Sequence, residues 1–344
     1  MATFIDRIKE RARADKKTII LPESMDSRIY EAAEKVLKED IANIIIIGTP
    51  EEVEKYGKGY DVSKATIINP YTYEKTEEYL NLFVELRKSK GLTYEEAKKM
   101  QEVQHETGKI LNIGVVNRFN DSVNLIKKYI DDGKLGEVYH VYASFRAHRS
   151  IPGLGGAFTT KEIAGGGALI DWGVHYLDIV MYCCGDPVAK TVSGEVFSKL
   201  GVDMKGYAYK DMWAGPPKFD GIYDVDDSVV AMIRTDGPTI TVHGAWAQNI
   251  GENEQYIDFI GDKAGIRLQY GKDFTIYTAE HGALVEYKPQ FKMRDHFQNE
   301  IDAFINCCKT GEKLPSHIDT NILTSRMMQA IYDSAEQHRE IVLE

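Results

Sequence analysis

The sequence predicts an α/β protein made of two parts. The first is a parallel, Rossmann-like but incomplete α/β domain, and the second is an α+β domain with a large, mainly antiparallel sheet that is open on one face. Over roughly the first hundred residues, short apolar runs alternate with amphipathic segments, which is typical of a parallel sheet with helical crossovers. From Val138 onward, longer strands follow one another with few helices between them, which is typical of an antiparallel sheet. The length of 344 residues suits about two domains, at ~150 residues each.

The N-terminal elements alternate in type along the chain. The short apolar or β-branched runs at 18–21, 43–47 and 66–68 end at Pro22, Gly48 and Asn69-Pro70, so each is expected to form a strand. A further apolar run at 110–116 is expected to add a fourth strand to this sheet. Helical patterns are predicted at 3–13, 27–39, 72–90, 93–106 and 122–130.

Strands dominate the C-terminal part. Alternating or continuous apolar segments predict strands at 138–145, 191–197, 227–235, 239–247, 255–261 and 274–278. Helical periodicity returns at 295–309 and 319–338, so terminal helices are expected to pack back on the domains.

Composition limits the classes of partner. A formal net charge of −11 argues against a nucleic-acid or anionic-membrane partner, because binding to such surfaces relies on clustered Lys and Arg. The longest apolar run, at 44–47, is far shorter than the ~20 residues of a membrane-spanning helix, and the first residues lack an apolar signal core, so a cytoplasmic location is expected. The cysteines form two adjacent pairs, which suit small apolar residues in a reducing compartment, and no metal site is expected.

The most informative segment lies at 165–178. A run of three glycines is followed by Asp171 and His175, which are four residues apart and would share one face of a helix. A carboxylate bound to one nitrogen of an imidazole fixes its tautomer, so the pair suits general acid–base catalysis. An ordinary intrahelical pair has the same spacing, and a metal site built from these two residues and Asp178 lacks a recognisable further ligand.

From about residue 101 to the end, the chain resembles the Gfo/Idh/MocA oxidoreductases. The matching segments follow in order: 107–109, 114–119, 133–138, the Asp171/His175 motif, 224–227, 259–265, 297–314 and 331–335. The resemblance implies a dehydrogenase that transfers a hydride between NAD or NADP and a sugar or polyol, with His175 as the proton-transfer residue and Asp171 as its partner. It also implies a homodimer or homotetramer assembled through the open face of the sheet.

Five further residues are candidates for binding the substrate. Aromatic faces and guanidinium groups suit a polyhydroxylated or carboxylated ligand. Half-buried aromatic residues of a sheet would give the same pattern. The candidates are Arg118, Arg146, His148, Trp213 and Trp246.

Two features of that family are missing from this sequence. The first hundred residues contain no G-x-G-x-x-G fingerprint, which lets a dinucleotide approach the start of a helix. The family's Glu-Lys-Pro motif is also absent, since the only Lys-Pro is Lys288-Pro289, far downstream. No cofactor-binding residue is therefore assigned, and binding of NAD or NADP is expected to be impaired.

Residues 1 to about 100 instead resemble the start of phosphate acetyltransferases. The resemblance lies in 4–13, 17–28, 32–33, 41–48 and 85–97, and it places Arg87 at a phosphate-binding position. A guanidinium suits an acyl phosphate, although an exposed arginine on a charged helix is the alternative. The chain is thus interpreted as a hybrid joined near residues 100–101, whether natural, engineered or an assembly error. Its expected domains are a transferase-like segment at 1–100, the last strand and helix of a nucleotide domain at 101–136, and a substrate and dimerisation domain at 137–344.

These observations favour an oxidoreductase of the Gfo/Idh/MocA type by descent, acting on a sugar or polyol hydroxyl and impaired in cofactor binding. One alternative is acyl transfer by the first part, although that family's catalytic segments are mostly missing. The other alternative is a non-enzymatic sugar-binding or scaffolding protein.

Overall fold

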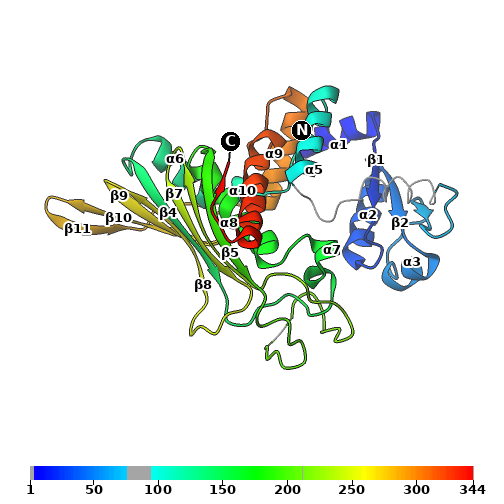
Figure 1. The fold of residues 1–344 in the computed structure, drawn as a ribbon. Coiled ribbons are helices and arrows are strands. Elements are labelled where there is room, and N and C mark those ends of the chain that lie inside the picture. The colour runs from blue at the N-terminus through cyan, green and yellow to red at the C-terminus, as the bar shows by residue number, and fades with distance from the viewer. Residues whose placement is uncertain (1–3, 76–93, 211, 344) are drawn as a thin grey trace. The chain divides into compact units, whose positions relative to one another are not determined.

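The structure, a computed structural model, describes residues 4–75, 94–210 and 212–343. It contains two compact units, Met1–Lys88 and Ser89–Glu344. The first unit is drawn in blue in Figure 1, and the second from cyan to red. In the described ranges, no helix combines the length and the apolar character needed to cross a membrane.

The first unit is a small parallel α/β structure. Its sheet has the order β1-β2-β3, with both pairs of neighbouring strands parallel. The helix between the first two strands covers this sheet with Tyr30, Ala33 and Leu37, which form one core with Ile44 and Ile46. The elements are α1 (Phe4–Ala14), β1 (Thr18–Leu21), α2 (Ser27–Glu39), β2 (Asn43–Ile47), α3 (Pro50–Tyr56) and β3 (Thr66–Ile68).

The three strand predictions for this unit are confirmed, but the predicted strand at 110–116 is wrong. Asn112 forms only an isolated bridge to His317, and the backbone N–H of Ile113 donates to Ser316 O at 3.1 Å. The segment therefore lies beside the start of a C-terminal helix of the second unit, where too few backbone groups pair to extend a ladder. Most of the predicted helix at 72–90 lies outside the described residues.

The second unit is built on a nine-stranded sheet with the order β11-β10-β9-β8-β4-β7-β6-β5-β12. All neighbouring strands are antiparallel except β4 and β7, which are parallel, so the predicted fold class is confirmed. Three strands, β9, β11 and β12, are absent from the sequence-based prediction; β11 is largely exposed and β12 has two residues, so neither has a clear apolar pattern. The strands are β4 (Val138–Arg146), β5 (Ala189–Phe197), β6 (Ser228–Thr235), β7 (Thr239–Ala245), β8 (Glu254–Gly261), β9 (Ala264–Gln269), β10 (Phe274–Glu280), β11 (Ala283–Tyr287) and β12 (Ile341–Val342).

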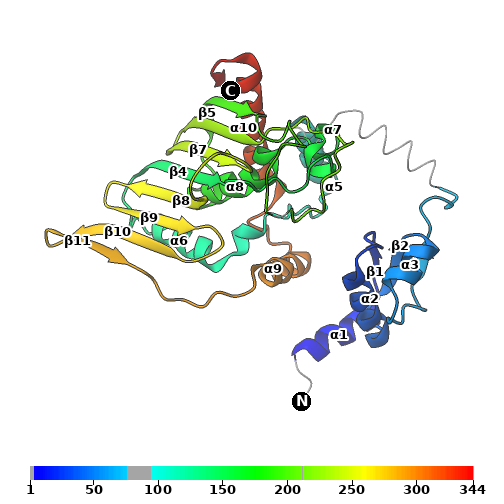
Figure 2. The same ribbon diagram turned by 90° about the horizontal axis from the view of Figure 1, so that it is seen from below.

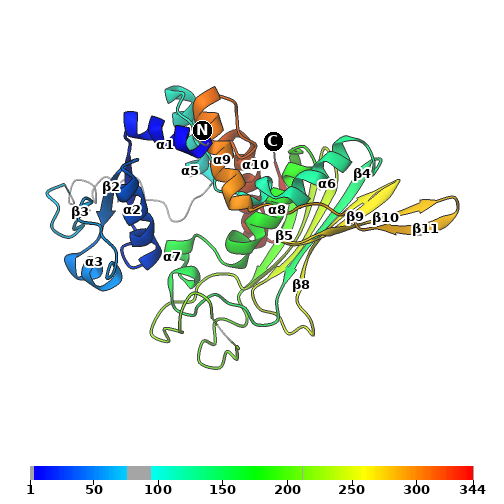
Figure 3. The same cartoon turned by 180° about the vertical axis from the view of Figure 1, so that it is seen from behind.

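Helices cover one face of this sheet, as Figures 2 and 3 show. Alternate strand residues such as Val141, Ala143 and Phe145 are fully buried on that face and share one core with Leu177 and Ile331. The helices of this unit are α5 (Tyr94–Thr107), α6 (Asp121–Asp131), α7 (Lys161–Ala164), α8 (Val174–Cys183), α9 (His296–Thr310) and α10 (Ile318–Gln337). Those that share the core beneath the sheet are α6, α8 and α10. Shorter turns are η1 (Val116–Phe119), η2 (Ala157–Thr159) and the π-helical turn η3 (Leu169–Gly173).

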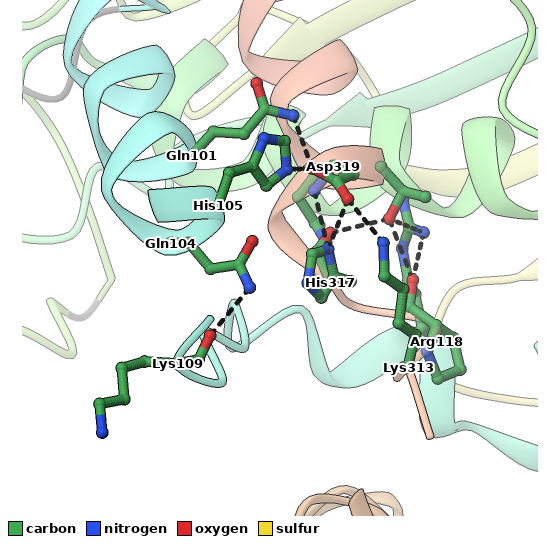
Figure 4. A network of polar contacts seen from close by, with 11 residues as sticks. Gln101, Gln104, His105, Lys109, Arg118, Lys313, His317 and Asp319 are labelled. Carbon is green, nitrogen blue, oxygen red and sulfur yellow. Dashed lines mark hydrogen bonds and ion pairs between the residues drawn. The ribbon is translucent and has the colours of Figure 1, made fainter. Parts of the chain in front are cut away.

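Polar contacts hold α5 against α10 within the second unit (Figure 4). Asp319 at the start of α10 accepts a hydrogen bond from Gln101 at 2.7 Å and one from Lys313 at 3.0 Å, and it lies 2.7 Å from His105 Nε2. Burial opposes ionisation of Asp319, but these hydrogen bonds outweigh it and lower the pKa of this carboxyl. Asp319 is therefore a charged anchor for α5, whose sequence offers few large apolar residues to bury.

Candidate functional site

The Asp171/His175 motif lies where its helix begins. Gly165 ends α7 with a φ of 81°, a left-handed conformation that glycine adopts without strain. A Cβ added at Gly167 would overlap the backbone carbonyl oxygen of Asp226, so this position requires glycine. The chain then enters the π-helical turn η3, which continues into α8, and π-helical turns frequently occur at functional sites.

Asp171 lies in η3 and His175 lies in the first turn of α8, and both are half-buried. The two side chains are close enough for each charge to shift the pKa of the other, but they form no hydrogen bond with each other. A π-helical turn is wider than an α-helical turn, so residues four apart no longer stack directly above one another. The two side chains therefore remain near each other, but the predicted tautomer-fixing hydrogen bond between them is absent.

Burial shifts the pKa of each group in the direction of its neutral form. Burial raises the pKa of Asp171, opposed in part by a hydrogen bond of 3.0 Å from Trp246 Nε1 to Asp171 Oδ2 and by the charge of His175. Burial lowers the pKa of His175, opposed in part by the charge of Asp171. The Nδ1 atom of His175 is buried and has no hydrogen-bond partner among the described residues. A neutral imidazole with an unpaired nitrogen can exchange a proton with a bound hydroxyl group.

Tyr270 is a site residue that the sequence analysis missed. Burial raises the pKa of its hydroxyl, and the charge of nearby Asp171 adds to this shift. Its hydroxyl accepts a hydrogen bond from Asn117 Nδ2 at 3.2 Å, and its ring stacks on Tyr176 with 4.5 Å between centroids. The only sequence signal was its place between the end of a strand and Gly271, which alone does not identify a site residue.

Arg118, predicted to bind the substrate, is instead fully buried. Its Nε and Nη2 atoms donate to both oxygens of Asp178, with distances of 2.7–3.1 Å, and its Nη1 atom donates to Pro315 O at 2.8 Å. Burial opposes the charge of Arg118, but hydrogen bonding to Asp178 outweighs it and raises the pKa of the guanidinium. These contacts give Arg118 a role in joining η1, α8 and the start of α10.

Arg146 and His148 lie away from the Asp171/His175 pair. Phe145 packs on Tyr176 on the helix-covered face, so the alternate residue Arg146 points to the open face of the sheet. There Arg146 donates to Gln248 Oε1 at 2.9 Å and pairs with Glu254 at 3.1 Å. His148 is exposed beyond the strand end.

The two predicted tryptophans lie in different environments. Trp246 is fully buried and reaches the site through its indole N–H, whereas Trp213 is 63% exposed and packs edge-on against Phe158. Arg87 lies outside the described residues. The structure thus places Asp171, His175 and Trp246 together, and it places the other described candidates, Arg118, Arg146, His148 and Trp213, elsewhere. Within the described ranges, no group of three or more His, Cys, Asp or Glu side chains could hold a metal ion.

The residues of the first unit do not fit a dinucleotide. Folds that bind dinucleotides place the phosphates on free amides at the start of the helix after the first strand. Here the carboxylate of Asp26 accepts from the backbone N–H of Arg28 at 2.9 Å and also binds its guanidinium. At the start of α3, the carboxylate of Glu52 accepts from Thr49 N and from the buried Ser24 hydroxyl, both at 2.8 Å.

These hydrogen bonds lower the pKa of both carboxyls, Asp26 through Arg28 and Glu52 chiefly through Thr49. At the start of α2, the helix after the first strand, the Asp26 carboxylate therefore already occupies the backbone amide of Arg28 that a pyrophosphate would need.

Two family models match successive parts of the chain. Residues 3–111 match the phosphate acetyl/butaryl transferases, and residues 123–267 match the GFO/IDH/MocA C-terminal domain. The first segment is 44% identical over 97 residues to phosphate acetyltransferase from Thermoanaerobacterium thermosaccharolyticum, which is 28% of this chain and 30% of that enzyme.

Other similarities extend over most of the chain. It is 29% identical over 323 residues to D-glucoside 3-dehydrogenase from Escherichia coli, covering 92% of this chain and 88% of that protein. The fold resembles levoglucosan dehydrogenase in complex with NADH and levoglucosan, with a TM-score of 0.66, 16% identity, and coverage of 95% of this chain and 99% of that one. The chain is therefore a hybrid that joins a phosphate acetyltransferase-like N-terminal segment to a C-terminal domain of the Gfo/Idh/MocA type.

Proposed function

We propose that the second unit binds a sugar or polyol and that His175 accepts the proton of one of its hydroxyl groups. The observation that carries this proposal is the buried Nδ1 of His175, which has no partner among the described residues. A buried polar atom left unpaired costs about 1–3 kcal/mol, so a ligand hydroxyl that binds it gains the same amount.

The neighbouring groups support this role. The lowered pKa of His175 keeps the imidazole neutral at neutral pH, which is the form that accepts a proton. Asp171, oriented by the Trp246 indole, would stabilise the imidazolium that results. The half-buried ring of Tyr270, held by stacking on the buried Tyr176, supplies the aromatic surface that suits a sugar ring.

The names of the similar proteins support the ligand class, since one is a D-glucoside dehydrogenase and another was solved with levoglucosan. We therefore propose that the chain is an oxidoreductase of this type by descent. Because the first unit does not fit a dinucleotide, we expect neither NAD nor NADP to bind tightly, and we expect sugar binding without efficient turnover. Acyl transfer is not proposed, since the matched segment spans 30% of the transferase.

Isothermal titration of the full chain with a panel of polyols and glucosides tests the binding proposal. His175→Phe removes the hydrogen bond and is expected to weaken binding about 5- to 150-fold, which corresponds to ~1–3 kcal/mol. His148→Phe, at an exposed position of the same unit, is the matched control and should bind like the wild type. Equal affinities for the wild type and His175→Phe would contradict the proposal.

A fluorescence titration with NADH or NADPH tests the cofactor defect. We expect no saturable binding in the micromolar range, because the carboxylates of Asp26 and Glu52 occupy the helix starts. Micromolar binding of either dinucleotide would contradict the expected defect in cofactor binding.

A further inference from the structure

The acidic motif at 224–227 has no place in the proposed chemistry, although two of its carboxylates are buried. Asp226 and Asp227 are 6% and 1% exposed, whereas Asp224 is exposed. Neither buried carboxylate touches Asp171 or His175. Burying a carboxylate is costly unless several donors bind it, so their contacts indicate what they do.

Asp226 binds the start of the helix that carries the pair. Its Oδ1 accepts from the backbone N–H of Gly167 at 2.8 Å, and its Oδ2 accepts from that of Leu169 at 2.9 Å. Its backbone oxygen accepts from the N–H of Ala168 at 3.0 Å. The hydroxyl of Tyr332, on α10, donates to Oδ1 at 2.7 Å. Three successive amides at the start of η3 are thus held by one residue.

The neighbouring aspartate holds the other side of the site. The backbone oxygen of Asp227 accepts from the N–H of Trp246 at 2.9 Å, and the indole of Trp246 donates to Asp171. The carboxylate of Asp227 accepts from three successive amides at 199–201, which ties down the loop after β5. Asp226 therefore fixes the start of the helix that carries Asp171, and Asp227 fixes Trp246, whose indole donates to the Asp171 carboxylate.

We propose that Asp226 is a positioning residue that sets the start of η3, and through it the burial and orientation of Asp171 and His175. This inference rests on the proposed function of the pair. An anion at a helix start is also stabilised by the helix dipole, and a π-helical turn, whose hydrogen bonding is irregular, needs such an anchor to persist. Gly167 allows the close approach, since a side chain there would overlap the backbone of Asp226.

The test compares Asp226→Asn with Asp224→Asn in the full chain. Asp224 belongs to the same motif, but it is exposed and binds the N–H of Lys161 at the start of α7, so it is a matched control. The readout is the titration of His175 by NMR, together with polyol affinity. In Asp226→Asn, one amide N–H faces an NH₂ donor instead of an oxygen, so the helix start loosens.

We expect the pKa of His175 to rise toward its ordinary value in Asp226→Asn, and polyol affinity to fall about tenfold, as for the loss of a charge-assisted hydrogen bond. Asp224→Asn should match the wild type in both readouts. An Asp226→Asn protein that is folded and shows the wild-type titration and affinity would overturn the proposal.

Tyr332→Phe covers the case in which Asp226→Asn does not fold. It keeps the carboxylate and its amide contacts but removes one donor, and it should shift the titration of His175 in the same direction by a smaller amount. An unchanged titration in this variant as well would overturn the inference. If the wild type binds no polyol but the titration responds to Asp226→Asn, the proposed function fails and the positioning role stands.

Discussion

Replacing Asp178 by Asn should strongly destabilise the second unit, because Asp178 is the main counter-ion of a fully buried arginine. The side chain of Arg118 is 0% exposed and that of Asp178 is 1% exposed, and the two make paired hydrogen bonds. A second carboxylate, Asp186, lies 3.4 Å from Arg118 and is 23% exposed. Asp178→Asn therefore leaves the buried Arg118 guanidinium with a single charged partner, Asp186, which forms a longer contact and is partly exposed to water.

Removing one partner of a buried ion pair costs about 3–5 kcal/mol, because the remaining charge stays buried. The residual attraction of Asp186 places the expected loss near the lower end, at about 3 kcal/mol. Asp186→Asn is the matched control and should cost about 0–1 kcal/mol, as for a partly exposed pair. Asparagine also tolerates the left-handed φ of 53° at that position.

Urea denaturation of the full chain, followed by tryptophan fluorescence, measures this loss. All three tryptophans, at positions 172, 213 and 246, lie in the second unit, so their fluorescence follows its unfolding without interference from the first. The double variant Arg118→Met/Asp178→Leu should recover more than half of the lost stability, because an apolar pair needs no counter-ion. A loss below about 1 kcal/mol for Asp178→Asn would refute the reasoning.

Three further predictions concern the helix start, the α5 contact and pH. Gly167→Ala should lower the urea midpoint of the second unit, because its methyl group would overlap the Asp226 carbonyl; an unchanged midpoint would show that the loop relaxes. Asp319→Asn should speed amide hydrogen exchange in α5 more than in the central strands, and equal rates would argue against an anchoring role. Polyol affinity should be constant near neutral pH and fall as the pH drops through the lowered pKa of His175, because a protonated imidazole can no longer accept the hydrogen bond of the ligand hydroxyl. His175→Phe should abolish that dependence.

The sequence was sufficient to predict elements that depend on local pattern. The apolar runs of β1 and β2, the long helix α10 and the alternating strands β4 to β8 were all recognisable, because burial on one face imposes a period of 2.0 or 3.6 residues. The glycine run before Asp171 likewise indicated a tight approach at a helix start.

Elements with weak local patterns were missed. The helix α3 has no buried residue, and Pro50 with the capping box of Thr49 and Glu52 stabilises it instead. The segment 110–116 has the composition of a strand, but its backbone groups pair with residues 316 and 317, about two hundred positions away. No local rule could select that partner.

The sequence alone determined that two ancestries meet in this chain and which helix carries the Asp171/His175 pair. Only the tertiary structure decided what surrounds that pair. Trp246 donates to Asp171, and Asp226 accepts from the backbone at the start of the helix. Arg118 is paired with Asp178 and does not face a ligand. The physical reason is distance along the chain. These contacts join residues separated by 59–75 positions, and they form only when a whole sheet and its helices pack and exclude water from the groups between them.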